Sequence, residues 1–173
     1  MSASPLSETR LATLETRLCQ LEDRLAILDL IASYGPAVDS RGEEAVASLW
    51  AGDGVYDFGG EPLEGAAAVG RLVDLDTHKG YVECGCAHVL GLPMVTISGD
   101  TAVATGYSRV YLHDAAGGGW KVERTSANRW ELIRTGAGWK VQRRVNRLLD
   151  GSAGARGLLH AGLVDAGLAE DAQ

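Results

Sequence analysis

The chain has 173 residues, enough for a single domain with a hydrophobic core. Its 23 acidic and 16 basic residues give a net charge of −7, without a basic stripe, so neither nucleic acid nor anionic membranes are expected partners. The sequence contains no apolar run of about 18 residues, so no membrane span is predicted. No signal-peptide pattern opens the chain, and three cysteines do not suit a disulfide framework. We expect a cytoplasmic protein.

A long amphipathic helix is predicted near the start of the chain. Its leucines alternate at spacings of three and four residues, as in a heptad repeat, at Leu11, Leu14, Leu18, Leu21, Leu25 and Leu28. Two interpretations remain open: the leucines pack on the core of their own chain, or they pair helices of two subunits. The helix continues towards Tyr34, and Gly35-Pro36 should then bend or end it, because proline removes a backbone donor.

Shorter elements are predicted next. A helix over residues 42–50 precedes a glycine-rich turn and a strand over residues 55–58. A further helix covers residues 66–75, and a polar loop follows over residues 77–80. His78 lies in this loop and is expected to be solvated.

The hydrophobic period changes to two after residue 80, which is typical of strands. The predicted strands cover residues 81–90, 94–98, 101–113, 120–133 and 139–149, with glycine-rich turns between several of them. Helices followed by long antiparallel strands predict an α+β fold, with the helices packed on one face of the sheet. We expect one domain over residues 1–150. The Gly- and Ala-rich tail over residues 151–173 is either disordered or folded over a neighbour, with a short helix near residues 158–163.

Asp39 and His88 are the residues best suited to acid–base chemistry. Asp39 lies where the first helix ends, although a carboxylate at a helix C-terminus opposes the helix dipole. His88 lies in an apolar strand. A carboxylate that holds one imidazole nitrogen leaves the other nitrogen free to accept a proton. The two residues would therefore form a general base if the fold brings them together.

The order of these segments resembles the SnoaL-like branch of the nuclear transport factor 2-like superfamily. This branch includes polyketide cyclases, scytalone dehydratase, bile-acid dehydratases and lindane dehydrochlorinase. The resemblance is carried by Ala37-Val38-Asp39-Ser40-Arg41, Ser48-Leu49-Trp50-Ala51-Gly52-Asp53-Gly54-Val55-Tyr56, the strand containing His88, Gly99-Asp100-Thr101-Ala102 and Gly138-Trp139-Lys140-Val141-Gln142-Arg143-Arg144. It implies a cone-shaped α+β barrel in which N-terminal helices pack on a curved antiparallel sheet.

The resemblance also implies roles for individual residues. Asp39 and His88 are similar to the Asp–His pair of dehydratases and dehydrohalogenases, in which the histidine abstracts a proton. Tyr34 matches a catalytic tyrosine of some dehydratases, and Arg144 matches an arginine beside the leaving group. Relatives often carry His-His or His-Tyr-Gly-Thr-Asn around the strand histidine. This chain has Ala87-His88-Val89-Leu90-Gly91-Leu92 instead, so an asparagine that could bind substrate is missing.

The strand pattern gives a different expectation for Arg144. Val141 and Val145 alternate with it, so a regular strand with these valines inside would turn Arg144 outward. A β-bulge, which is common beside active sites, would reverse that alternation. Both orientations therefore stay open.

The sequence also predicts which residues form the pocket wall, and it predicts a site without metal or cofactor. The expected substrate-binding residues are Trp50, Tyr56, Phe58, Cys86 and Tyr107. Cys84, Cys86 and His88 would share one strand face, but neighbours on that face stand about 6.6 Å apart, so no metal site is expected. No glycine-rich nucleotide-binding motif occurs, and no cofactor is expected.

The resulting hypothesis is a cofactor-independent lyase that acts on a small hydrophobic cyclic or hydroxylated substrate by dehydratase-type elimination. His88 would be the base and Asp39 would orient it. An isomerase or cyclase of the ketosteroid or polyketide type is the first alternative, and a non-catalytic binding module is the second. A homo-oligomer is expected, with a trimer favoured by the resemblance and a dimer as the alternative.

Overall fold

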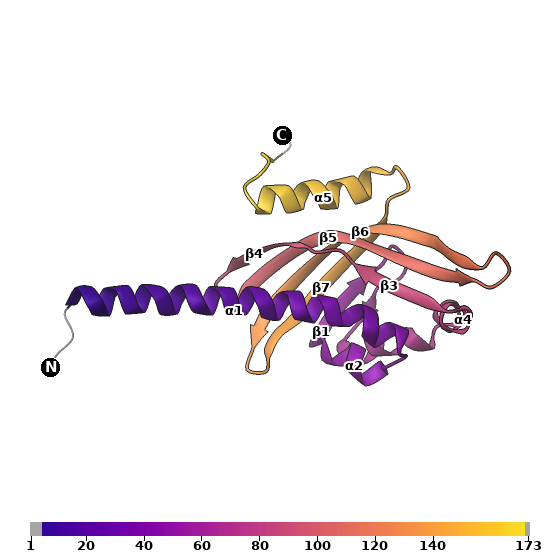
Figure 1. The fold of residues 1–173 in the computed structure, drawn as a ribbon, viewed down its shortest axis with the longest axis horizontal. Helices are drawn as coiled ribbons and strands as arrows, with labels where there is room; N and C mark the ends of the chain where they lie inside the picture. Colours follow the sequence, from indigo (N-terminus) through magenta and orange to yellow (C-terminus); the bar gives the residue numbers. More distant parts are fainter. Residues whose placement is uncertain (1–4, 172–173) are drawn as a thin grey trace.

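The computed structural model describes residues 5–171, so both ends of the expected domain and tail, residues 1–4 and 172–173, lie outside it (Figure 1). The helical elements are α1 (Pro5–Asp39), α2 (Glu43–Ser48), α3 (Ala66–Gly70), the 3-10 turn η1 (Arg71–Asp74), α4 (Asp76–Cys84) and α5 (Ala153–Asp165). The strands are β1 (Trp50–Asp57), β2 (Leu63–Glu64), β3 (Cys86–Leu90), β4 (Met94–Ser98), β5 (Thr101–Asp114), β6 (Gly119–Thr135) and β7 (Gly138–Leu148).

The seven strands form one sheet in the order β2-β1-β7-β6-β5-β3, and β4 also pairs with β5. The pairings are antiparallel except that of β1 with β7, which is parallel. The sheet curves without closing, and α1 to α4 pack on it as the predicted α+β cone requires (Figure 1). Among the described residues, no helix combines the length and apolar character needed to cross a membrane.

The two faces of the sheet carry different partners. Ala104 and Trp130 oppose each other on β5 and β6 and belong to the core shared with α1. The next residues, Thr105 and Arg129, point to the other face, where α5 packs. A Cβ on Gly162 of α5 would lie 2.5 Å from that of Thr105, so the helix approaches closely. Part of the predicted tail therefore covers the sheet of its own chain.

Gly35-Pro36 was predicted to bend or end the helix, and the second outcome does not occur, because α1 continues to Asp39. Proline has no backbone N–H, so the carbonyl of Ala32, four residues earlier, lacks its helical hydrogen bond. Both Pro36 and Ala32 are exposed. Water can solvate that carbonyl, so the helix continues. Helix α1 contacts the core through Ile27, Ile31, Tyr34 and Val38, and Leu28 packs against the same core. The other heptad leucines, here called the leucine seam, are exposed: Leu11, Leu14, Leu18, Leu21 and Leu25.

The segment between residues 75 and 90 differs most from the prediction. Residues 76–84 form α4 rather than a loop and the start of a strand, and β3 begins only at Cys86. Gly85 separates the two elements with a φ of 87°, which L-residues rarely adopt. His78 is buried in α4 and is not solvated. Cys84 ends that helix, so the expected row of Cys84, Cys86 and His88 on one strand does not exist.

The other elements agree with the prediction more closely. Strand β4 has the predicted limits, and β5, β6 and β7 differ by two residues or fewer at each end. Strand β1 begins five residues before the predicted start, because Trp50 already pairs with Val141. The helix predicted over residues 66–75 divides into α3 and η1.

Candidate active site

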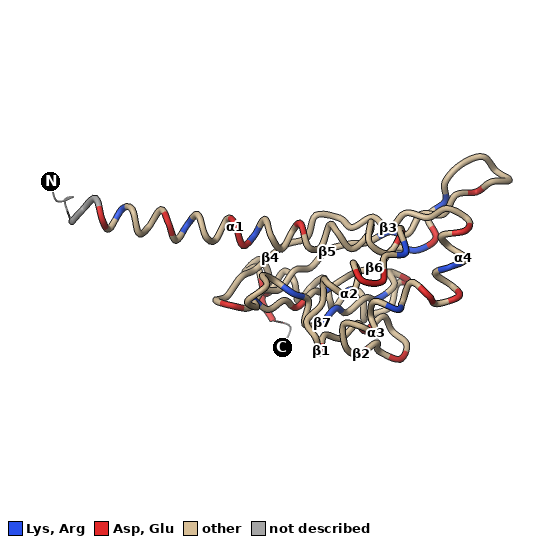
Figure 2. Tube along the Cα trace, turned by 90° about the horizontal axis from the view of Figure 1, so that it is seen from below, with Lys and Arg blue, Asp and Glu red and all other residues tan. Residues whose placement is uncertain are grey.

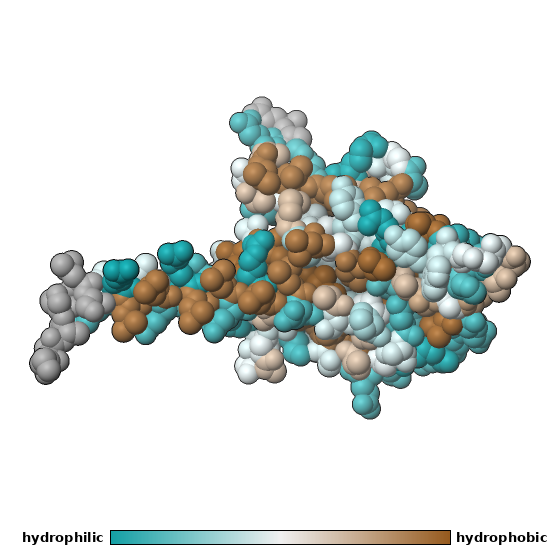
Figure 3. Space-filling model, viewed as in Figure 1, coloured by the Kyte–Doolittle hydropathy of each residue, from teal (hydrophilic) through white to brown (hydrophobic). Residues whose placement is uncertain are grey.

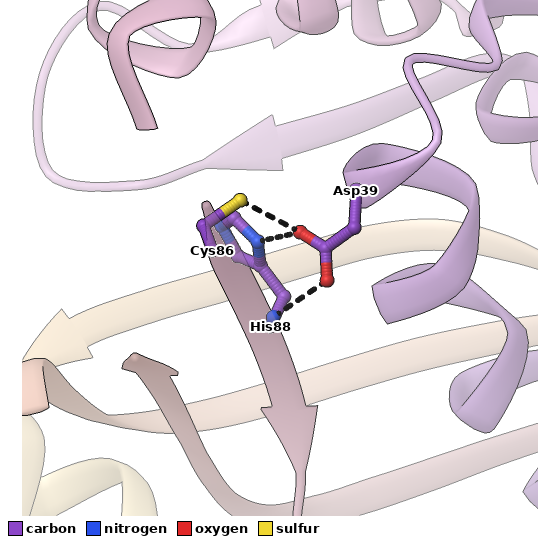
Figure 4. Close-up of side chains that lie close together, drawn as sticks. All are labelled: Asp39, Cys86 and His88. Atoms are coloured by element: carbon purple, nitrogen blue, oxygen red, sulfur yellow. Dashed lines mark hydrogen bonds and ion pairs between the residues drawn. The ribbon is translucent and has the colours of Figure 1, made fainter. Parts of the chain in front are cut away.

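The predicted contact between Asp39 and His88 is present (Figure 4). Asp39 comes from the last residue of α1, and His88 comes from the middle of β3. The Nδ1 atom of His88 lies 2.5 Å from Oδ1 of Asp39. The end of a helix and an edge strand, nearly fifty residues apart in the sequence, therefore form one hydrogen-bonded pair.

Three donors from β3 hold the Asp39 carboxylate in place. Its Oδ1 accepts from the His88 ring and from Sγ of Cys86 at 3.3 Å, and its Oδ2 accepts from the backbone N–H of His88 at 2.8 Å (Figure 4). Burial alone would raise the pKa of this carboxyl, but the donors and the nearby imidazole outweigh it, so its pKa lies below the ordinary value. Asp39 is therefore an ionised acceptor whose two oxygens are both engaged.

The ionised carboxylate fixes the tautomer of His88. A carboxylate can only accept, so Nδ1 of His88 must carry the proton in this hydrogen bond. The Nε2 atom then keeps its lone pair, and no hydrogen bond to it occurs within the described part of the chain. Since the His88 ring lines a pocket, this lone pair is suited to accept a proton from a bound molecule.

The pocket has a volume of about 200 Å³ and is mainly apolar. An apolar cavity of about 150 Å³ can bind benzene, so this one suits a single substituted ring. Its wall comes from the end of α1, from β1 to β3, from η1 and α4, and from β6. The lining residues are Tyr34, Tyr56, Phe58, Leu63, Leu72, Leu75, Thr77, His78, Tyr81, His88 and Arg124.

Tyr34 lines this pocket, as expected for a residue with a chemical role. Its ring is buried and packs edge-on against Tyr56 and Trp130. Burial raises the pKa of Tyr34, Tyr56 raises it further, and the charge of Arg144 opposes both effects. The hydroxyl therefore stays protonated at neutral pH and remains a hydrogen-bond donor.

Arg144 points inward, so the bulge expectation is correct and the regular alternation is wrong. Glu131 pairs with Arg143 but Leu132 pairs with Val141, which leaves Gln142 as an extra residue in β7. Val141 and Arg144 consequently both face the core, and Arg144 is 2 % exposed.

The guanidinium of Arg144 lies among three aromatic rings. Its Cζ is 4.1 Å from the ring centroids of Tyr34 and Trp130 and 4.7 Å from that of Tyr56. Oδ1 of Asn128 accepts from Nε at 3.1 Å and from Nη2 at 2.8 Å, whereas Nη1 has no partner within the described residues. Arg144 does not line the pocket but lies directly behind Tyr34. It can act on a ligand only through its field and through the tyrosine.

The expected substrate-binding residues divide into two groups. Tyr56 and Phe58 line the pocket. Trp50 is buried in the core behind it, Cys86 donates to Asp39, and Tyr107 is 47 % exposed on β5, so these three do not line it. Sequence alternation alone could not distinguish the two groups, because every one of these residues lies on or next to a strand.

His78 and Arg124 line the pocket but were not predicted. The buried His78 donates from Nε2 to the carbonyl of Val38 at 2.8 Å, and its ring lies 5.6 Å from that of His88. Burial lowers the pKa of His78, and the hydrogen bond to Val38 opposes this only in part. Arg124 is half-buried and forms no ion pair or hydrogen bond among the described residues.

The backbone explains how Arg124 reaches the pocket. His88 pairs with Val110, which pairs with Arg124, so these residues share one row and one face across β3, β5 and β6. A bulge that leaves Glu123 unpaired follows this row, because Tyr111 already pairs with Val122. No sequence signal marks that bulge, which is why Arg124 could not be identified from the sequence.

Asp39, Cys86 and His88 carry atom types that can bind a metal ion. Their ligand atoms lie within 4.8 Å of one another. However, burial, followed by the contact with Asp39, raises the pKa of the Cys86 thiol to about 12, so it remains a protonated donor. An ion would also have to replace the hydrogen bond between Asp39 and His88. These residues fit a hydrogen-bonded pair better than a metal centre.

A family model and a solved structure are similar to most of this chain. The model of the SnoaL-like domain matches residues 19–145. A crystal structure of an NTF2-like protein with a cystatin-like fold from Novosphingobium aromaticivorans is 48% identical, with a TM-score of 0.83, over 86% of this chain and 96% of that one. No curated protein in the comparison matches the chain.

More distant solved structures share the fold. A hexachlorocyclohexane dehydrochlorinase from Novosphingobium barchaimii is 21% identical over 77% of this chain and 90% of that one, with a TM-score of 0.66. An NTF2-like superfamily protein from Salmonella enterica is 13% identical over 78% and 97% of the two chains, with a TM-score of 0.65.

Proposed function

Because the chain belongs to the SnoaL-like domain family, we propose that it is a cofactor-independent lyase acting on a small, mainly hydrophobic ring compound. The observation that carries this proposal is the hydrogen bond between Nδ1 of His88 and Asp39 in the wall of an apolar pocket. The dehydrochlorinase of similar fold is an eliminating enzyme by name, which supports the reaction class by analogy only.

The reaction would begin at Nε2 of His88, which takes a proton from a carbon beside the leaving group. The electrons of that C–H bond form a C=C bond while the bond to the leaving group breaks. Asp39 stabilises the imidazolium that results, because its carboxylate already accepts from Nδ1. A positioned base of this kind contributes about 10²–10⁴-fold to a rate.

Tyr34 would assist the departure of a hydroxyl group. Its protonated O–H can donate to that oxygen and transfer its proton, so that water leaves. The proton held by His88 then passes to the phenolate of Tyr34, directly or through water, which restores both residues to the resting state. Arg144 lies 4.1 Å behind the Tyr34 ring, and its positive charge stabilises the transient phenolate.

Asp39 itself is a poor candidate for the proton-transferring base of an isomerase. Both of its oxygens accept hydrogen bonds from β3, and it does not line the pocket. An enzyme in which Asp39 shuttles the proton would need to break these contacts. Elimination by His88 requires no such rearrangement.

Arg124 would bind the polar end of the substrate. Among the described residues it is the one formally charged side chain in the pocket wall, and it has no internal partner. It lies two strands from His88, which is about 10 Å at a strand spacing of about 4.8 Å. A carbonyl or carboxylate on the ring could bind there while the reacting carbon lies beside His88.

A panel of single-ring β-hydroxy ketones and hydroxy acids would test the proposal. Mass spectrometry would follow loss of one water, which marks elimination, or an isomer of equal mass, which marks isomerisation. We expect elimination with the wild type and its loss in His88→Gln and Tyr34→Phe. The matched controls His113→Gln and Tyr107→Phe alter exposed residues and should retain it. Binding without turnover of any compound would support the binding module instead.

A further inference from the structure

The leucine seam of α1 projects from the domain without a partner. Residues 8–20 are exposed on all sides of the helix, and Figure 1 shows this part of α1 extending beyond the sheet. The exposed fractions of Leu11, Leu14, Leu18, Leu21 and Leu25 lie between 50% and 60%. Figure 3 shows these apolar residues as a band along the projecting helix. An exposed continuous stripe of this kind marks an interaction surface.

The charges that flank the seam determine what can cover it. With Leu11 at heptad position a and Leu14 at d, the g positions are basic and the e positions are acidic. The g residues are Arg10, Arg17 and Arg24, and the e residues are Glu15, Glu22 and Asp29. Figure 2 shows basic and acidic positions following one another along α1.

These charges have no opposite partners on their own helix. Neither Arg10 nor Arg17 has an acidic residue three or four positions away, the spacing at which helical side chains meet. Glu15 and Glu22 likewise have no basic residue at that spacing. None of the four forms an ion pair within the described chain. Water solvates these exposed charges in the single chain, and opposite charges for all four have to come from another molecule.

We infer that α1 pairs in parallel and in register with α1 of a second copy of this chain. In a parallel pair each g residue meets the e residue of the next heptad. Arg10 then lies beside Glu15 of the partner subunit, and Arg17 lies beside Glu22 of the partner subunit. An antiparallel pair would instead place g beside g and e beside e, which brings like charges together.

The rest of the molecule leaves room for this pairing. Ile27, Ile31 and Tyr34 bind α1 to the core, whereas the leucine seam faces about a third of a turn away from them, at about 100° per residue. The Asp23 carboxylate accepts hydrogen bonds from both terminal nitrogens of Arg134 at 2.5 Å and from Nε1 of Trp139 at 3.1 Å. These bonds anchor the helix beside the sheet. The anchored part nucleates the helix, so a short seam suffices for pairing.

Light scattering on the full chain tests the surface. We expect a dimer that becomes monomeric in Leu14→Glu/Leu18→Glu, with an unchanged far-ultraviolet spectrum because both residues are exposed. The control Ala12→Glu/Cys19→Glu adds the same charge on another side of the helix and should remain dimeric. A monomeric wild type, or an assembly of any size that survives the leucine changes, would overturn the inference.

A second experiment tests the direction. In a Cys19→Ser/Cys84→Ser background, Leu14→Cys should form a 14–14 disulfide on mild oxidation, because a disulfide needs Cα atoms within about 7 Å. Arg10→Glu/Arg17→Glu and Glu15→Arg/Glu22→Arg should each weaken the dimer about tenfold or more, and mixing the two variants should restore it. Absence of the disulfide, or charge variants as tight as the wild type, would exclude the parallel pair.

Discussion

A methyl group on Gly35 would lie 2.2 Å from the carbonyl oxygen of His88. The glycine thus permits the end of α1 to lie directly on β3, which is the approach that brings Asp39 to the histidine. A backbone carbonyl cannot rotate away as the end of a long side chain can. The close contact, rather than a break in the helix, explains why glycine occurs at this position.

We predict that Gly35→Ala separates α1 from β3. Overpacking of this kind typically lowers the free energy of unfolding by about 1–3 kcal/mol. Chemical denaturation would measure that loss, and turnover of any identified substrate should fall because Asp39 moves with the helix. The matched control is Gly80→Ala in α4, where a new Cβ meets nothing within 4 Å. That change should be neutral or stabilising by about 0.5–1 kcal/mol. Equal effects of the two substitutions would contradict this account.

The second prediction concerns coupling between Asp39 and His88. Asp39→Asn can turn its amide towards Nδ1, which moves the histidine proton to Nε2 and removes the base. We expect each of Asp39→Asn and His88→Gln to lower kcat by about 10²–10⁴-fold. The double variant should lose little more than either single one, because the residues act as one unit. Losses that multiply, or activity that survives His88→Gln, would argue for two separate roles.

Regular strands and the Asp–His pair were predictable because their signals are local or inherited from the resemblance. Strands β4 to β7 follow alternating residues closed by glycine turns. Their pairing could not be predicted to the residue. The extra residue Gln142 becomes visible only when β7 is aligned with β6, and this one residue decides that Arg144 faces the core.

Helix α4 and the burial of His78, by contrast, could not be predicted from the local sequence. The alternating pattern of the following strand extends backwards across Gly85 and predicts residues 81–84 as part of that strand, whereas they belong to α4. Polar neighbours made His78 look solvated, although its partner is the carbonyl of Val38, forty residues earlier. Long-range contacts override local polarity in both places. The same applies to the pocket wall, for which Trp50 and Tyr107 were predicted from residue type alone.

A third prediction links His78 to the pH dependence of stability. Burial holds the pKa of His78 below its ordinary value of 6.5 in the folded chain, so the unfolded chain binds the proton more readily. The stabilisation by neutral His78 is complete above pH 6.5 and is lost as the pH falls towards the folded pKa. Thermal unfolding should therefore show a midpoint that decreases over this acidic range.

Substitution of His78 gives the measurement that isolates it. His78→Gln keeps a donor for Val38 but does not titrate, so part of the slope below pH 6.5 should disappear. The control His160→Gln removes an exposed histidine of α5 and should leave the slope unchanged. If both variants retain the wild-type slope, another group is responsible for it.

The last prediction separates two roles of Arg144. Its guanidinium contacts three rings, and two of its nitrogens donate to Asn128, whereas a lysine could neither stack flat nor donate from the two ends of a planar fork. Arg144→Lys should therefore destabilise the fold by about 2 kcal/mol, the value of a lost hydrogen bond to a charged group. Arg144→Met replaces the buried charge by an apolar chain, and such replacements are often nearly neutral for stability.

Activity should show the reverse order for these variants. Arg144→Met removes the positive charge behind Tyr34, so kcat should fall while urea unfolding stays close to that of the wild type. The control Arg143→Met alters the neighbouring residue, which forms an ion pair of 3.2 Å with Asp57. Arg143 does not line the pocket, so this variant should retain kcat. If Arg144→Met folded normally and kept full activity, the arginine would serve packing alone, and Tyr34 would need another source of stabilisation for its phenolate.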